Sequence, residues 1–173
     1  MDSARQAIVL NHYTLMRTYQ TLEFVERLNA KYSFATPRTS MTIREAFVAL
    51  EGYVDSSDPD VGLPNLVHMF QTAEGIREDG HPDWMQLVGL IHDMGKLMYL
   101  WGTAEDGQVG TAAGPQFALG GDTWVAGCRI PDCTVLPELN KLNPDMADPR
   151  YNTGNKSRDI YAVYIYNNRV RYL

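Results

Sequence analysis

The chain of 173 residues is poor in cysteine and contains no long apolar run. Its two cysteines, Cys128 and Cys133, can form neither a disulfide framework nor a zinc knuckle by themselves, so we expect reduced thiols. No stretch of eighteen apolar residues occurs, and Met1 is followed by Asp2 and Arg5 instead of a signal-type apolar core. Membrane insertion and secretion are therefore disfavoured, and a cytoplasmic location is expected.

Positive charge is also scarce, because 15 Lys and Arg stand against 21 Asp and Glu and give a formal charge of −6. No basic patch precedes the C-terminal tail, so nucleic acid and anionic membranes are disfavoured as partners. Hydrophobic residues make up 45% and charged residues 21%, as in an ordinary globular domain. We expect one domain, monomeric, that binds a small molecule, a metal or both.

The apolar spacing predicts a mainly α fold. Thr42 and Glu45 form a capping-box pattern ahead of an apolar helical stretch, and Gly102 suits the end of a helix. After Gly102 the many glycines predict a loop-rich segment. Four helices are predicted: residues 6 to about 30, a helix starting at 42, residues 65–77, and residues 84–101, the last nearly buried on all sides.

An adjacent pair, His92 and Asp93, lies inside the predicted fourth helix, and His68 lies on the helix before it. The run LVGLIHDMGK places this pair among apolar residues, where an unpaired carboxylate would cost several kcal/mol to bury. Coordination of a cation would offset that cost, and imidazole with carboxylate suits iron, manganese or zinc. The alternative is a buried His-Asp pair joined only by a hydrogen bond.

Several segments, in order, resemble the myo-inositol oxygenases, a family of the wider HD-domain superfamily. They are DSSDPDVGLPN, HMFQTAEGIR, LVGLIHDMGK, LWG, GDT, VAGCR and NPDMADPRYNT. The resemblance implies an HD-domain-like helical bundle with a mixed-valent di-iron centre. It also implies the substrates: myo-inositol and O2 would be converted to D-glucuronate, a four-electron oxidation by one dioxygen that serves inositol catabolism.

The resemblance also implies roles for single residues. His68, His92 and Asp93 match iron ligands, with Asp93 as the carboxylate that bridges two irons, and Lys96 matches a basic group beside the substrate. Because Lys96 follows Asp93 by three residues, both face one side of a helix, and they are the candidate catalytic residues. The matching substrate contacts are Asp55, Ser57, Lys96, Gly121 and Asp122.

Most of these residues have a plainer interpretation. Asp55 could end a helix, Ser57 and Asp122 could be turn residues, and Lys96 could be a solvated charge. His12 and His81 match no ligand of the family; we expect His81 to be exposed. The three tryptophans, at positions 84, 101 and 124, are expected to fill the core or a cavity wall.

The resemblance covers residues 10–153 and then stops, so the domain is expected to be truncated there. The tail, residues 154–173, carries +3 and the remainder therefore −9. The family needs two more histidines and another aspartate downstream, but no histidine follows His92. The third and fourth helices should then expose apolar surface, and turnover should be weak or absent. The alternatives are a non-catalytic metal-binding fragment and an HD-type metal-dependent phosphohydrolase.

Overall fold

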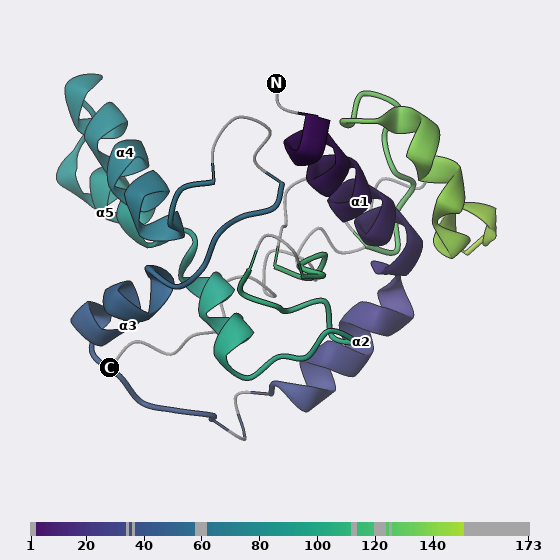
Figure 1. The fold of residues 1–173 in the computed structure, drawn as a ribbon, viewed down its shortest axis with the longest axis horizontal. Helices are drawn as coiled ribbons and strands as arrows, with labels where there is room; N and C mark the ends of the chain where they lie inside the picture. Colours follow the sequence, from purple (N-terminus) through teal and green to yellow (C-terminus); the bar gives the residue numbers. More distant parts are fainter. Residues whose placement is uncertain are drawn as a thin grey trace.

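The computed structural model describes residues 3–33, 35, 37–57, 62–111, 114–119, 124 and 126–150. Within them the secondary structure is helical and no strand is formed, which confirms a mainly α fold. The helices form two groups with the segment 94–119 between them (Figure 1). α3, α4 and α5 lie on one side, and α1 and α2 lie on the other with η2, a 3-10 helix spanning Pro137–Leu142.

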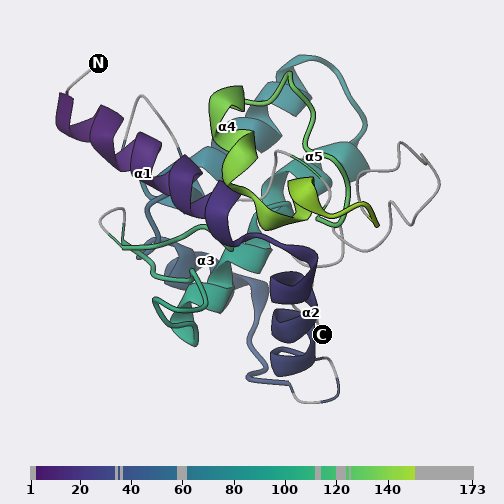
Figure 2. The ribbon, with the colours of Figure 1, turned by 90° about the vertical axis from the view of Figure 1, so that its right-hand side faces the viewer.

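The first predicted helix is two helices, α1 (Ser3–Tyr19) and α2 (Leu22–Lys31), so the prediction of one helix was wrong. Thr21 adopts an extended conformation, and its hydroxyl accepts a hydrogen bond from the Phe24 amide as an N-cap. Side chains from η3, a 3-10 helix spanning Pro144–Ala147, and from its N-cap form hydrogen bonds with the backbone between α1 and α2. Asp145 accepts one of these bonds from the Leu22 amide. The chain thus bends between α1 and α2, and η2 lies alongside α1 (Figure 2).

α3 (Ile43–Leu50) begins as predicted. The Thr42 hydroxyl accepts from the Glu45 amide at 3.3 Å, and the Glu45 carboxylate accepts from the Thr42 amide at 2.7 Å. These reciprocal bonds satisfy two amides of the first turn, as a capping box does.

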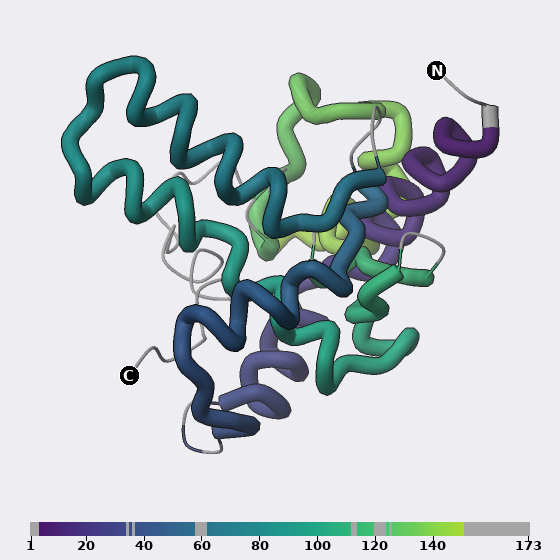
Figure 3. The backbone as a smooth tube through the Cα atoms, turned by 60° about the vertical axis from the view of Figure 1, so that its left-hand side comes forward, coloured from purple at the N-terminus to yellow at the C-terminus, as the bar shows by residue number. Residues whose placement is uncertain are grey.

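α4 (Asn65–Glu78) and α5 (Asp83–Ile91) form an antiparallel hairpin that projects from the body of the protein (Figure 3). The two helices approach closely at Gly89, where an added Cβ would lie 2.5 Å from Ile76 Cδ1 and 3.5 Å from the Cα of Ala73. A side chain at position 89 would therefore press against α4. None of the described helices is both long and apolar enough to cross a bilayer.

The predicted fourth helix is not continuous. α5 ends at Ile91, and η1, a 3-10 helix, follows at Met94–Leu100, so His92 and Asp93 form the junction. In a 3-10 helix residues three apart eclipse each other, and this places Met94 and Leu97, both fully buried, on one face. The tighter winding directs these two side chains into the core.

Two small hydrophobic cores hold the fold together. One joins α3, α4 and η1, and the other joins α1, α2 and the residues Phe117 and Ala118. Met98 and Trp101 pack against both cores. The segment 94–119 therefore acts as the connection between the two helical groups, and it carries the junction at His92 and Asp93 at its start.

The expectation that the fourth helix is buried on all sides was wrong. Trp84, Leu87 and Val88 share one face of α5 and are 66%, 53% and 53% exposed, so Trp84 does not fill the core. On α4, Val67 and Phe70 are also exposed. The Phe70 ring contacts that of Phe47 on α3, with the ring centroids 6.0 Å apart, yet half of Phe70 stays exposed. The exposed apolar residues of the hairpin agree with the apolar surface expected there.

We predict that this apolar face of α5 drives self-association. Leu87→Glu should lower the binding of a dye that recognises apolar surface, and it should lower the concentration-dependent association measured by sedimentation. The unfolding free energy should change by less than about 0.5 kcal/mol, because the Leu87 side chain packs little. Gln71→Glu, at an exposed position of α4, adds the same charge without removing apolar surface. Equal association of both variants and the original chain would contradict the prediction.

Candidate metal centre

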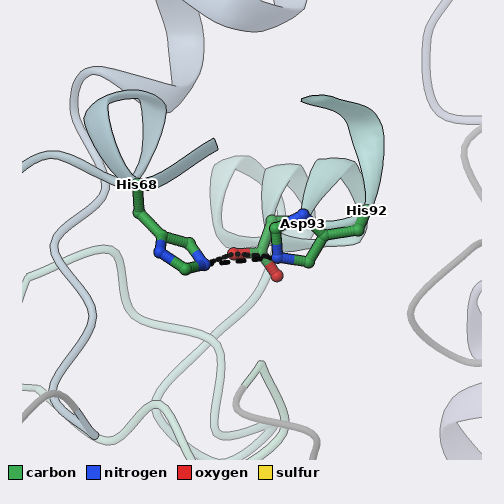
Figure 4. Close-up of side chains that lie close together, drawn as sticks. All are labelled: His68, His92 and Asp93. Carbon is green, nitrogen blue, oxygen red and sulfur yellow. Dashed lines mark hydrogen bonds and ion pairs between the residues drawn. The ribbon is translucent and has the colours of Figure 1, made fainter. Parts of the chain in front are cut away.

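Three potential metal ligands meet where α4 faces the junction between α5 and η1 (Figure 4). His68 Nε2 lies 3.3 Å from His92 Nε2, and the two nitrogens lie 3.7 and 3.5 Å from Asp93 Oδ2. All three side chains point toward one another. The Asp93 side chain is 15% exposed, whereas the His68 side chain is 55% exposed, so the cluster has an open side.

The backbone fixes the orientation of His92. Its Nδ1 lies 2.7 Å from the carbonyl oxygen of Gly89, and a carbonyl can only accept, so Nδ1 carries the proton. In the neutral ring Nε2 then has a lone pair, and that lone pair points into the cluster. Metal-binding histidines are commonly held in this way through the other ring nitrogen.

The spacing of the three atoms fits a shared cation. Ligand atoms about 2.1 Å from one ion, at angles near 90 to 110°, lie roughly 3.0 to 3.5 Å from each other. The observed separations of 3.3, 3.5 and 3.7 Å are close to these values. Two imidazoles with one carboxylate are also the ligand set of non-haem Fe(II) sites with open positions.

Lys96 is buried directly beside this cluster. Its ammonium donates to Asp55 Oδ2 at 2.6 Å, to Asn65 Oδ1 at 2.9 Å and to Asp93 Oδ2 at 2.9 Å. Burial alone would lower the pKa of Lys96, but the charges of Asp93 and Asp55 raise it above its usual value. Lys96 is therefore protonated at neutral pH and acts as a hydrogen-bond donor, with no free lone pair for a base.

Asp55 connects the lysine to the loop before α4. Its Oδ1 accepts from the Ser57 hydroxyl at 2.7 Å and from the Ser57 amide at 2.8 Å. Burial by itself would raise the pKa of Asp55, but the charge of Lys96 and the hydrogen bonds from Lys96 and Ser57 lower it to about 2. One network of contacts thus runs from Ser57 through Asp55, Lys96 and Asp93 to the two histidines.

The structure places most of the candidate residues in this one network. Lys96 is buried, so its interpretation as a solvated charge was wrong. Asp55 lies five residues beyond the end of α3 at Leu50, so it does not end that helix. Ser57 does form a turn with Asp55, as its plainer interpretation holds, and contributes to the network as well. Gly121 and Asp122 lie outside the described residues.

The two other histidines and the two cysteines lie in different environments. His81 is exposed in the turn between α4 and α5, as expected. Both cysteines are free thiols, as expected. His12 is buried at 3% exposure, distant in sequence from the cluster, and contacts the loop at Ser56.

Sequence reasoning missed Asn65, whose side chain is 2% exposed and accepts from Lys96. It was treated only as the start of a helix. No local signal identified it, because Asn is common at helix starts and its partner Lys96 lies 31 residues away in sequence.

Comparison with known proteins identifies relatives of this chain. A profile of the family described as Myo-inositol oxygenase matches residues 6–164. The inositol oxygenase of Mus musculus is 48% identical over 149 residues, which cover 84% of this chain and 47% of the mouse protein. Those of Homo sapiens and Danio rerio are 45% and 43% identical over 148 residues, covering 84% of this chain and 47% and 49% of their own lengths.

A helical fold with a cluster of two histidines and an aspartate defines a candidate metalloprotein. The chain belongs to the myo-inositol oxygenase family. The chain spans about half the length of the curated relatives it matches. The boundary after Thr153 stays a prediction, and the family match itself extends to residue 164.

We predict that Asp55 makes stability depend on acid pH. Its pKa is about 2 in the folded chain and about 3.9 when unfolded, so its ionised form contributes about 2 to 3 kcal/mol. Because the folded pKa is the lower one, this contribution is complete above about pH 4 and is lost as the pH falls toward 2.

Asp55→Asn should therefore lower the unfolding free energy of the metal-free chain by about 2 to 3 kcal/mol at pH 7, and by much less near pH 2.5. Urea unfolding at both pH values measures this. Glu105→Gln, at an exposed carboxylate, should change little at either pH. A loss that is equally large at both pH values would show that the ion pair is not its source.

Proposed function

We propose that this chain carries the first metal site and part of the polyol site of an inositol oxygenase. The observation that carries the proposal is the approach of His68 Nε2, His92 Nε2 and Asp93 Oδ2 to within 3.3 to 3.7 Å of one another, beside the buried Lys96. Iron is the proposed metal because two imidazoles and one carboxylate with open positions suit Fe(II). When bound, iron would supply the activation of O2.

The residues beside the cluster suit a polyhydroxylated ring. Asp55 has one carboxylate oxygen that accepts from Lys96 and another that accepts from Ser57, and a carboxylate can accept about four hydrogen bonds. It therefore retains capacity for a substrate hydroxyl. Ser57 can also accept, since its hydroxyl proton is directed at Asp55. Lys96 can turn one N–H to the substrate once Asp93 serves as a metal ligand.

Lys96 in this proposal orients the substrate and stabilises negative charge on its oxygen. Its raised pKa keeps the ammonium charged near neutral pH, and a buried charge acts more strongly on a nearby oxygen than an exposed one. A phosphohydrolase is not favoured, because a phosphate substrate suits several Lys or Arg side chains near the metal. Besides Lys96, the cation considered is Arg77, which pairs with Glu74 on the exposed side of α4.

Apart from a bridging Asp93, a second iron would have almost no ligands among the histidines of this sequence. Of its four histidines, two form the cluster and His81 is exposed in the hairpin turn. The fourth, His12 on α1, forms a hydrogen bond with Ser56. The proposal for this chain is therefore one iron and weak or absent turnover, with the complete reaction proposed for the longer proteins of the family.

We predict that the three-residue cluster binds about one Fe(II) per chain. In anaerobic equilibrium dialysis with metal analysis, His92→Ala should weaken binding at least about tenfold because one of three ligands is lost. His81→Ala should bind like the original chain, since its imidazole lies outside the cluster. Equal binding by all three proteins would rule out this cluster as the site, and two tightly bound irons would contradict the single-site proposal.

Glucuronate formed from myo-inositol with Fe(II) and O2 tests the catalytic part. We expect no product, or a rate far below that of a full-length relative assayed in parallel, because catalysis by a di-iron centre needs the ligands of the second iron. Turnover at the rate of the relative, abolished by His92→Ala, would overturn this expectation and show that the chain is a complete enzyme.

A further inference from the structure

A buried network of hydrogen bonds contacts the loop that carries Asp55. Ser56 lies between the two candidate substrate contacts, is 2% exposed, and has side-chain partners different from those of Asp55. Its hydroxyl lies 2.8 Å from Gln116 Oε1 and 2.8 Å from His12 Nδ1. Both partners are also buried, at 1% and 3% exposure, and they are 60 and 44 residues away in sequence.

The orientation of the Gln116 amide is fixed by the backbone. Gln116 Nε2 donates to the carbonyl oxygen of Val54 at 2.7 Å, and Gln116 Oε1 accepts from the Ser56 amide at 2.8 Å. If the amide were reversed, two acceptor oxygens would meet at Val54 and two N–H donors would meet at Ser56. Oε1 is therefore the acceptor, and it also receives the hydroxyl proton of Tyr53 at 3.2 Å.

His12 and Gln116 share the hydroxyl group of Ser56. Gln116 Oε1 accepts from the Ser56 amide and from the Tyr53 hydroxyl, and the Ser56 hydroxyl lies 2.8 Å from both Oε1 and His12 Nδ1. A hydroxyl can donate one hydrogen bond and accept another. Ser56 therefore connects His12 on α1 to Gln116 in either tautomer of the His12 ring.

α1 contacts the same loop at a second point. Arg5 Nη2 donates to the backbone carbonyl oxygen of Asp55 at 3.0 Å. Arg5 and His12 are seven residues apart and so lie on one face of the helix. The loop is therefore bonded to α1 on one side and to Gln116 on the other, while the Asp55 side chain extends to Lys96 at 2.6 Å.

We infer that His12, Ser56 and Gln116 are positioning residues that hold Asp55 against Lys96 for substrate binding. The inference rests on the proposed role of Asp55 as a polyol contact. A buried polar group costs free energy unless its partners are all present, and an apolar residue at position 12 would fill the same space. The polar network instead fixes one conformation of the loop from Tyr53 to Ser57.

The titration of Asp55, followed by carboxyl carbon NMR in the metal-free chain, tests this inference. Asp55 has its low pKa because it touches Lys96, so a displaced loop should raise that pKa by about one unit or more. His12→Leu removes the hydrogen-bond partner of Ser56 and should cause this rise. His12→Asn places an amide group, which can donate or accept, near the position of Nδ1 and should restore most of the low pKa.

Met16→Leu, a change in the buried side of α1, is the matched control. It should lower stability in urea without moving the pKa of Asp55, which separates positioning from general packing. Ser56→Ala is a milder variant if His12→Leu does not fold, because it keeps the hydrogen bond from the backbone N–H of residue 56 to Gln116. It should also raise the pKa of Asp55. An unchanged pKa in the folded variants, or an equal rise in Met16→Leu, would overturn the inference.

The measurement needs neither iron nor inositol. Failure of metal binding or turnover would therefore refute the proposed function without affecting this result. Conversely, an unmoved pKa of Asp55 would refute the positioning role and leave the metal site intact.

Discussion

The ammonium group of Lys96, buried between Asp55 and Asp93, is the constraint on which the site depends. A buried charge costs several kcal/mol unless it is paired and its hydrogen bonds are satisfied. Lys96 meets this condition with three acceptors that come from the loop before α4, from the first residue of α4 and from the junction after α5. These three parts of the chain must therefore take up their places together, because displacement of any one leaves the charge incompletely paired.

The candidate metal site follows from the same constraint. Asp93 Oδ2, the atom that receives the bond from Lys96, is also the oxygen nearest to both imidazoles. The close approach of α4 and α5 at Gly89 and the hydrogen bond from His92 to the Gly89 carbonyl set the histidines around that oxygen. The lysine thus connects the three candidate metal ligands to Asp55. The contact of Ser56 with His12 connects the same loop to α1.

Much of this could be predicted from the sequence, and the failures have physical causes. The capping box at Thr42 and Glu45 was recognisable because it is local, and the pairing of Asp93 with Lys96 because residues three apart share a face in either kind of helix. The end of α5 before His92 was missed because the apolar run continues into η1, where Met94 and Leu97 are buried in the core. Trp84 was misplaced because hydrophobicity alone does not reveal which face of a helix finds a partner.

The sequence by itself determined the helical class, the family and the three metal-ligand candidates, since these depend on local spacing and on motifs. The tertiary structure alone decided that Lys96 is buried, that Asn65 completes its bonds and that His12 and Gln116 reach Ser56. The physical reason is distance along the chain. Hydrogen bonds between residues 31 to 60 positions apart depend on how helices pack, and packing is settled by the summed burial of many side chains whose pairing no local pattern encodes.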